Sequence, residues 1–284
     1  METMFSNYHD YNYINALLFN NLHRIPNDID AIVGIPRSGM ITAVILAEFK
    51  SLPVTDIFSF VQGIDAVNLN SNGSRTKQFK NSGINHILLV DDAVGTGNTM
   101  RNSVNFIRDK YKNLKITTFG TFVESFSTNA IDIYCEVMRY QFMPYSILKR
   151  GMPLACIDMD GIFTEDVPPM YDTDDENYVN FLMNQRQMYV PDSNVGVIVT
   201  GRLEKYRAVT EAWLKKHNIG YSYLVMLDLE SKLQRNRINV GEYKANVYLK
   251  SGRDLFIESN YNEAITIKKI SNKAVYCTQI CNMV

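Results

Sequence analysis

Short apolar runs alternate with segments of helical spacing along most of this chain. In the first half, residues 31–35 and 86–90 form two such runs, and the apolar residues that follow each of them recur at helical intervals. Apolar runs of this length without polar alternation are typical of strands buried on both faces of a sheet. The pattern therefore predicts the α/β class, with mainly parallel sheets flanked by helices.

The same alternation begins afresh near residue 150. Residues 154–157 and 195–199 are apolar runs, and residues 203–217 have the spacing of an amphipathic helix. The 284 residues leave room for two domains of about 100–200 residues each. We therefore predict a first domain over residues 1–150 and a second over residues 151–284.

Composition excludes several classes of protein. The chain has 29 Lys and Arg against 30 Asp and Glu, without the basic excess of a general nucleic-acid binder, so we expect no nucleic-acid partner. Its apolar runs fall well short of the roughly 20 residues that cross a bilayer, so we expect no transmembrane segment. The start of the sequence lacks the regions of a signal peptide, and the four scattered cysteines form no disulfide framework. These features predict a cytoplasmic protein.

The sharpest motif of the first half runs from Ile87 to Thr99. Four apolar residues lead to Asp91 and Asp92, and a loop rich in glycine and threonine then opens a helix. Backbone N–H groups at a helix N-terminus suit a phosphate, and glycines let the backbone approach it closely. Two carboxylates would repel that phosphate, so sugar hydroxyls or a metal ion must face them. The motif thus predicts a site for a phosphoribosyl ligand.

All 13 positions of this motif resemble the signature of the type I phosphoribosyltransferases. The resemblance covers about residues 20–140 and implies that phosphoribosyl diphosphate is a substrate. Asp91 and Asp92 would hold the ribose 2- and 3-hydroxyls. The loop that would hold the 5-phosphate comprises Ala93, Val94, Gly95, Thr96, Gly97 and Thr99. A nucleotide-binding or purely structural strand-to-helix turn is the alternative.

The resemblance also implies two further substrate-binding segments. Arg37, Ser38 and Gly39 follow the first strand, where the family has its diphosphate loop. Residues 62–83 would form the mobile catalytic loop, in which Arg75 and Lys77 would meet the departing diphosphate.

A second pair of aspartates, Asp158 and Asp160, follows the apolar run at residues 154–157. Asp158 could act as a nucleophile, with Asp160 as general acid and base. A carboxylate can approach a phosphate dianion only when a cation and further donors neutralise the charge. Such groups follow later segments of the chain. Thr200 and Gly201 come after the apolar run at residues 195–199, Lys244 opens a predicted helix, and Glu258 ends a later predicted strand.

These segments resemble the haloacid dehalogenase superfamily of phosphatases over about residues 153–277. The resemblance implies a Rossmann-like domain with a small cap, in which Asp158 forms an aspartyl-phosphate. Thr200, Gly201 and Lys244 would bind the substrate phosphate. Asp158, Glu258 and the Asp160 carbonyl would bind Mg²⁺, because carboxylate and carbonyl oxygens suit that ion.

The last of these segments departs from the family pattern. Where the family has a second aspartate, adjacent or after three intervening residues, this chain has Ser259 and Asn262. A degenerate domain that only binds its ligand is therefore an alternative. Only about thirty residues separate Thr164 from Val195, and so small a cap implies a bulky or polymer-linked phosphate ester. Within that segment, the acidic run at residues 172–176 is expected to be a solvated loop or a helix start.

Together the two resemblances imply a bifunctional enzyme. A transferase product carries a 5-phosphate, and its removal would defeat nucleobase salvage but would suit an enzyme that makes an unphosphorylated ribofuranose. The pair resembles bacterial enzymes that install ribofuranose in surface polysaccharides. The expected partners are phosphoribosyl diphosphate, a glycan or lipid-linked glycan acceptor and, as is common in the transferase family, a second copy in a homodimer. The alternatives are a nucleobase or nucleotide enzyme with a metabolite phosphatase, and a regulatory protein that senses phosphoribosyl diphosphate.

Overall fold

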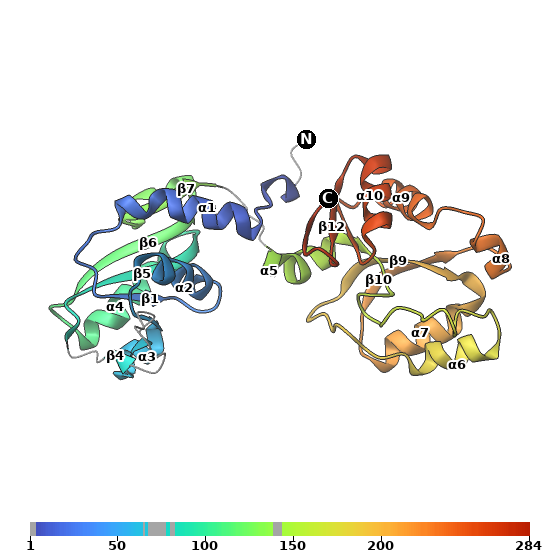
Figure 1. Cartoon of the computed structure of the whole chain (residues 1–284), viewed down its shortest axis with the longest axis horizontal. Helices are drawn as coiled ribbons and strands as arrows, with labels where there is room; N and C mark the ends of the chain where they lie inside the picture. The colour runs from blue at the N-terminus through green and yellow to red at the C-terminus, as the bar shows by residue number, and fades with distance from the viewer. Residues whose placement is uncertain (1–3, 65, 68–77, 80–82, 139–143) are drawn as a thin grey trace. The chain divides into compact units, whose positions relative to one another are not determined.

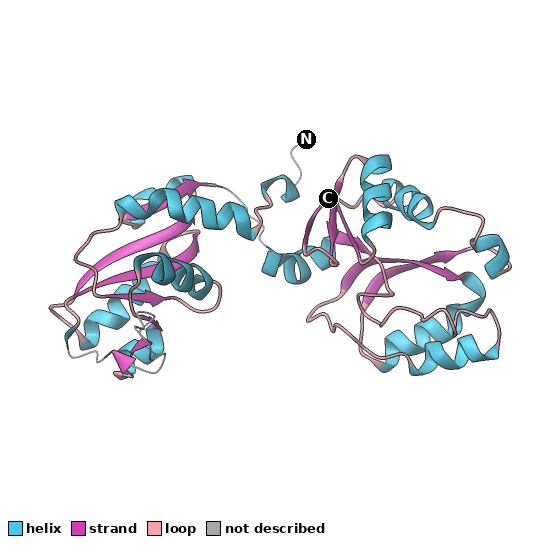
Figure 2. Ribbon diagram, viewed as in Figure 1, coloured by secondary structure: helices cyan, strands magenta, loops and turns pink. Residues whose placement is uncertain are grey.

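The computed structural model describes residues 4–64, 66–67, 78–79, 83–138 and 144–284. The chain divides into two compact units (Figures 1 and 2). His9–Gln141 form the N-terminal unit, and Met1–Tyr8 with Phe142–Val284 form the C-terminal unit. The sequence places the division later, after residue 150. Each unit has its own sheet with helices packed on it, which confirms the predicted α/β class.

In the described part of the N-terminal unit, the strands lie in the order β4-β3-β2-β1-β5-β6-β7. Neighbours from β2 to β7 are parallel, and β3 and β4 are antiparallel at one edge. The strands are β1 (Ala31–Gly34), β2 (Val54–Asp56), β3 (Ala66–Val67), β4 (Gln78–Phe79), β5 (His86–Val94), β6 (Lys115–Val123) and β7 (Ile133–Val137). The helices are α1 (Tyr11–Asn21), α2 (Gly39–Lys50), α3 (Ile57–Gln62) and α4 (Asn98–Lys110).

Two predicted segments of this unit differ from the structure. The sequence of residues 53–60 predicts a strand over that whole range, but β2 stops at Asp56. The Asp56 side chain accepts hydrogen bonds from the N–H groups of Phe58 and Ser59 and thereby caps α3. The expected loop over residues 91–98 is also shorter, because β5 continues beside β6 as far as Val94. The two acidic residues therefore lie within a paired strand.

In the C-terminal unit, the strands described lie in the order β10-β9-β8-β11-β12-β13, and only β13 is antiparallel to its neighbour. They are β8 (Ala155–Ile157), β9 (Val195–Leu203), β10 (Tyr221–Leu227), β11 (Leu255–Glu258), β12 (Ala274–Cys277) and β13 (Asn282–Met283). The helices are α5 (Pro144–Ser146), continued by a π-helical turn (Ile147–Gly151), then α6 (Glu176–Asn184), α7 (Arg207–Lys216), α8 (Lys232–Arg235), α9 (Val240–Lys250) and α10 (Tyr261–Ser271). Phe5, 4% exposed, belongs to the core of this unit.

The acidic run in the small cap is anchored by ion pairs, contrary to the expectation of a solvated loop. Asp174 pairs with Lys205 at 2.6 Å, and Asp172 pairs with Lys232 at 3.1 Å. Asp175 accepts hydrogen bonds from the first N–H groups of α6 and caps it, so the expected helix start is present. These contacts fix the cap segment to the loops that follow β9 and β10.

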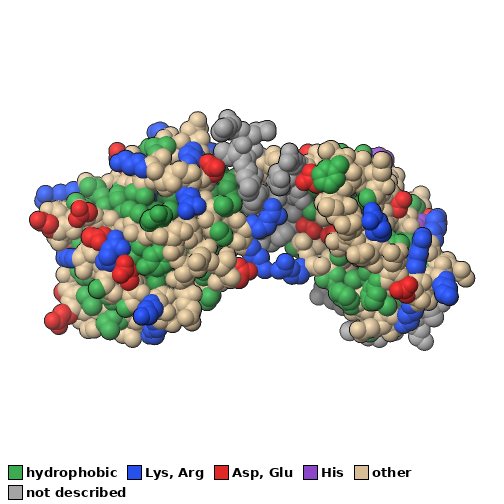
Figure 3. All heavy atoms as spheres, turned by 180° about the vertical axis from the view of Figure 1, so that it is seen from behind, with side chains coloured by type: hydrophobic (Ala, Val, Ile, Leu, Met, Phe, Trp, Pro, Cys, Tyr) green, Lys and Arg blue, Asp and Glu red, His purple; other side chains and the backbone are tan. Residues whose placement is uncertain are grey.

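The surface matches the balanced composition. On the face drawn in Figure 3, Lys and Arg side chains lie among Asp and Glu, and no wide area of one charge is seen. None of the helices in the described ranges combines the length and apolar character that a membrane span requires.

Candidate functional site

The topology brings the two predicted phosphoribosyl segments of the N-terminal unit together. β1 and β5 are parallel neighbours, so the turn after β1 lies beside the end of β5. There the Ser38 hydroxyl donates to Asp92 Oδ1 at 2.8 Å. Gly39 begins α2 so close to β5 that a Cβ atom on it would lie 3.0 Å from Asp91 Oδ1 and from the Val90 carbonyl oxygen. The residues predicted for the diphosphate loop and those predicted to bind ribose are therefore contiguous.

Asp91, the first of the two aspartates, lies in an environment that disfavours its charge. Burial and the neighbouring charge of Asp92 raise the pKa of Asp91 to about 8. Among the described residues, no Lys, Arg or His forms an ion pair with Asp91; the main-chain N–H of Asp92 donates to its Oδ1 at 2.9 Å. A partly buried carboxyl pair of this kind favours a ligand that supplies hydroxyl donors or a cation.

The loop after β5 has the geometry predicted for a phosphate site, with one restriction. Ala93 and Val94 complete β5, and the Val94 side chain is only 4% exposed in the core, so only its main chain is accessible to a ligand. Gly95 and Thr96 are exposed, and Gly97 precedes α4 with φ 75°. Thr99 is exposed in the first turn of this 13-residue helix. Free N–H groups at such an N-terminus attract anions.

Of the three cationic side chains predicted for this site, the structure describes only Arg37. Arg37 is exposed in the turn after β1, and the peptide bond between Pro36 and Arg37 is cis. Arg75 and Lys77, predicted to meet the diphosphate, lie outside the described residues.

Comparison with known families agrees with this geometry. Residues 5–119 match the family model described as "Phosphoribosyl transferase domain". Residues 5–119 therefore carry a phosphoribosyl transferase domain. This match supports the first of the two resemblances over that range.

Solved structures similar to the chain include other phosphoribosyltransferases. Helicobacter pylori xanthine-guanine-hypoxanthine phosphoribosyltransferase is 17% identical with a TM-score of 0.38, over 50% of this chain and 92% of that one. The purine phosphoribosyltransferase from Pyrococcus horikoshii Ot3 is 17% identical with a TM-score of 0.35, over 49% and 92% of the two chains. No curated protein sequence gives a significant match.

The second candidate site surrounds one buried lysine of the C-terminal unit. Lys244 Nζ lies 2.9 Å from Asp158 Oδ2, 2.8 Å from Glu258 Oε2 and 2.8 Å from Glu263 Oε2. Glu258 is fully buried at the end of β11, and Lys244 is 3% exposed on α9. Burial lowers the pKa of Lys244, and the three carboxylates raise it. The effect of the carboxylates is the larger, so the pKa lies well above its usual value. The lysine is therefore a fixed positive charge next to Asp158.

Asp160 has a separate cation. Arg202 donates from Nε to its Oδ2 at 3.0 Å and from Nη2 to its Oδ1 at 2.6 Å, and Thr164 and Gln185 donate to Oδ1 at 3.0 Å. Burial alone would raise the pKa of Asp160, but Arg202 and these hydrogen bonds hold it below its usual value. Without a bound substrate Asp160 is ionised, ready to accept a proton; it must gain one before it can donate.

Ser259 lies where the three oxygens proposed to bind magnesium converge. Its Oγ is 2.9 Å from the Asp160 carbonyl oxygen, 3.3 Å from Asp158 Oδ2 and 3.5 Å from Glu258 Oε1. Gly161 allows this approach, because a Cβ atom there would lie 2.6 Å from Ser259, and its φ of 78° favours glycine. Among the described residues, no three His, Cys, Asp or Glu side chains form a metal cluster. The candidate set, with two carboxylates and one carbonyl, still fits a hard cation in donor chemistry.

The remaining predicted residues lie on β9. Thr200 is fully buried, and its Oγ1 accepts from the Arg202 N–H at 3.2 Å. Gly201 lies between them and lines a cavity of about 170 Å³ together with Asp158 and Lys244.

Sequence reasoning assigned no role to Arg202, Glu263 or the Ser259 hydroxyl. The sequence could have indicated Arg202, because it lies two positions after Thr200 and residues at this spacing in a strand point to the same face of the sheet. The position of Glu263 depends on how α10 packs beside α9, which no local pattern reveals.

Proposed function

We propose that this chain transfers 5-phosphoribose from phosphoribosyl diphosphate to a glycan hydroxyl and then removes the 5-phosphate, leaving ribofuranose. The observation that carries the proposal is a second acidic site in the same chain as a phosphoribosyltransferase domain. In that site a buried, positively charged Lys244 lies 2.9 Å from Asp158, as a phosphate-directed nucleophile requires. The product of the first site would be the substrate of the second.

In the first step, the bond between ribose C1 and the diphosphate oxygen breaks, and a bond from C1 to the acceptor oxygen forms. Diphosphate leaves, and the acceptor hydroxyl releases its proton. Asp91 and Asp92 hold the ribose hydroxyls, and the N–H groups of the loop from Gly95 to Gly97 hold the 5-phosphate. The two ribose hydroxyls would donate hydrogen bonds to these carboxyl groups.

In the second step, an Asp158 oxygen attacks phosphorus, and the bond from phosphorus to the ribose 5-oxygen breaks. Asp160 first takes a proton, either from solvent or from the monoanionic form of the incoming phosphate ester, and gives it to the departing 5-oxygen. It later takes a proton from the water that hydrolyses the aspartyl-phosphate. Lys244 and the Thr200 hydroxyl bind the phosphoryl oxygens. Magnesium held by Asp158, Glu258 and the Asp160 carbonyl would neutralise charge on the phosphoryl group. The Arg202 pair favours the second of the two proton transfers, because it keeps Asp160 ionised.

The combination of activities favours a glycan acceptor over a nucleobase. A nucleobase enzyme makes a nucleotide, and a phosphatase in the same chain would undo that product. Removal of the 5-phosphate from a ribosylated glycan yields a finished residue and makes the transfer effectively irreversible.

The first experiment offers phosphoribosyl diphosphate and magnesium to the full chain with either nucleobases or a candidate glycan primer. Diphosphate release that depends on the glycan is expected. Release that depends on a base and on no sugar would overturn the acceptor assignment, and would favour the nucleobase alternative.

Asp158→Asn tests the sequence of steps. The variant should still transfer phosphoribose, but its product should keep the phosphoryl group, because an amide does not attack phosphorus. Mass spectrometry of the acceptor distinguishes the two products. Asp228→Asn, an exposed aspartate of the same unit, is the matched control and should yield the dephosphorylated product. An Asp158→Asn product without the extra phosphoryl group contradicts the scheme.

A further inference from the structure

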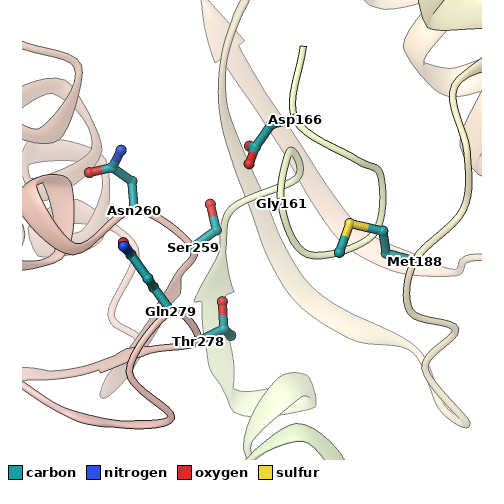
Figure 4. Close-up of a pocket in the computed structure, with 7 residues that line it drawn as sticks. All are labelled: Gly161, Asp166, Met188, Ser259, Asn260, Thr278 and Gln279. Carbon is teal, nitrogen blue, oxygen red and sulfur yellow. The ribbon is translucent and has the colours of Figure 1, made fainter. Parts of the chain in front are cut away.

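A larger pocket opens beside the Asp158 cluster within the C-terminal unit (Figure 4). Its volume is about 660 Å³, within the roughly 300–1,000 Å³ of small-molecule sites. Asp166, Ser259 and Asn260 line both this pocket and the 170 Å³ cavity that contains Asp158 and Lys244. A phosphate ester with its phosphoryl group at Asp158 can therefore extend its alcohol portion into the larger pocket.

Two side-chain amides of this pocket have their orientation fixed by the backbone. Asn260 Oδ1 accepts from the N–H groups of Asn262 at 2.9 Å and Glu263 at 3.1 Å. Gln279 Oε1 accepts from the N–H of Tyr261 at 3.0 Å. Because both amide oxygens are engaged, each NH₂ group is left as a donor. Figure 4 shows these two side chains on the same side of the pocket.

Acceptor groups complete the lining. The Asp166 carboxylate is directed toward Ser259 in Figure 4, across from the two amides. Thr278 Oγ1 lies 3.5 Å from the Glu258 carbonyl oxygen and can accept a hydrogen bond through its lone pairs. The pocket thus offers both donors and acceptors, which is the requirement of a hydroxyl group, since a hydroxyl donates and accepts.

The composition of the lining disfavours a ligand with a second phosphate group and a ligand with a flat base. The seven described lining residues, Gly161, Asp166, Met188, Ser259, Asn260, Thr278 and Gln279, include no Lys, Arg or His. A second phosphate group would have no cation there and would face the Asp166 carboxylate. These residues include no aromatic ring either, so a flat base would have no stacking partner, and Met188 is the one sizeable apolar side chain.

We infer that this pocket binds the alcohol portion of the phosphatase substrate, and that the ligand is a neutral, hydroxyl-rich sugar rather than a nucleoside base. The inference rests on the proposed function, since it assigns the leaving group of the same reaction. It also names a specificity-determining residue, Gln279, which has no contact with Asp158, Asp160 or Lys244 among the hydrogen bonds of the described residues.

The test compares two phosphate esters on the full chain with magnesium. Methyl β-D-ribofuranoside 5-phosphate places sugar hydroxyls in the pocket, whereas 4-nitrophenyl phosphate has none. Gln279→Leu should lower kcat/KM for the riboside phosphate about fivefold, the effect of one lost hydrogen bond, and leave the aryl phosphate within about twofold. Gln279→Glu retains the acceptor for the Tyr261 N–H and replaces the NH₂ donor with a carboxylate oxygen, so it should show the same selectivity. Asn246→Leu, a change at an exposed amide on α9, is the matched control.

A binding measurement separates this inference from the proposed function. Saturation-transfer NMR with unphosphorylated methyl β-D-ribofuranoside should show contact that Gln279→Leu weakens, and adenosine should show none through its base protons. Riboside binding of this kind in a chain that cleaves neither ester would uphold the pocket and overturn the proposed phosphatase. Cleavage of both esters with no selective effect of Gln279→Leu, or adenosine contact through its base, would overturn the pocket assignment alone.

Discussion

Both units have two aspartates at the carboxyl end of a buried strand, but their electrostatic surroundings are opposite. Asp91 and Asp92 are adjacent, and the neighbouring charge and burial raise the pKa of Asp91 to about 8. Asp158 and Asp160 are separated by one residue and have one cation each, Lys244 and Arg202. The pKa of Asp160 is held below its usual value.

The difference matches the chemistry proposed for each site. Burial and the charge of Asp92 disfavour the ionised form of Asp91, so a ligand that brings donors, as a ribose diol does, would stabilise that form. In the second site Arg202 holds the pKa of the proton acceptor Asp160 below its usual value, and the ammonium group of Lys244 lies 2.9 Å from the nucleophile Asp158. Substitutions that remove one cation or one charge at a time test this difference.

Lys244→Met should have the largest effect. It leaves Asp158, Glu258 and Glu263 without their shared cation, and breaking a buried ion pair in this way costs about 3–5 kcal/mol. Trp213, the chain's one tryptophan, is 2% exposed in this unit, so its fluorescence during urea unfolding reports on this unit. Phosphatase activity should also disappear.

Lys250→Met, at the exposed end of the same helix, is the control and should unfold like the unaltered protein. A Lys244→Met midpoint equal to that of the control would mean that the three carboxylates do not need this lysine.

Arg202→Met should cost about 3 kcal/mol at pH 7, because Asp160 then lacks its buried partner. Since Arg202 lowers the pKa of Asp160, its stabilisation is complete above the usual aspartate pKa of 3.8 and is lost as pH falls through the folded value. The deficit measured by urea unfolding should therefore be smaller at about pH 3. The acid limb of the phosphatase pH profile should move to higher pH. Arg237→Met, at an exposed position, is the control; an unmoved acid limb would contradict a proton-transfer role for Asp160.

Asp91→Asn should act in the other direction and stabilise the N-terminal unit. A pKa of about 8 in the folded state, against 3.8 for an ordinary aspartate, means that folding becomes costlier as pH rises between these values and the cost is complete above pH 8. The gain should be larger at pH 9 than at pH 5, as calorimetry can measure. Asp109→Asn on α4 provides an exposed control. Binding of phosphoribosyl diphosphate should weaken in Asp91→Asn, and equal gains at both pH values would refute the raised pKa.

The sequence predicted the sheets better than the side-chain networks. The sequence predicts strands over residues 115–123 and 221–227, and β6 and β10 have these bounds, because apolar runs define buried strands locally. The prediction of a strand over residues 53–60 was wrong, because the Asp56 side chain caps α3 and the strand ends there. Arg202 and Glu263 were missed for a different reason. Their partners are distant in sequence, and only the packed units bring these charges together.

Ser259→Ala should have the smallest effect. Ser259 is the position at which this chain departs from the phosphatase family pattern. The Ser259 hydroxyl lies within 3.5 Å of Asp158 Oδ2, the Asp160 carbonyl and Glu258 Oε1, so its loss removes one donor from three converging acceptors. We expect a stability cost of about 1 kcal/mol and a shift in the magnesium concentration needed for half-maximal phosphatase activity. Ser222→Ala, at an exposed position on β10, should change neither quantity. If Ser259→Ala leaves the magnesium requirement unchanged while stability falls, the hydroxyl only supports the fold, and the two acidic sites differ by their cations alone.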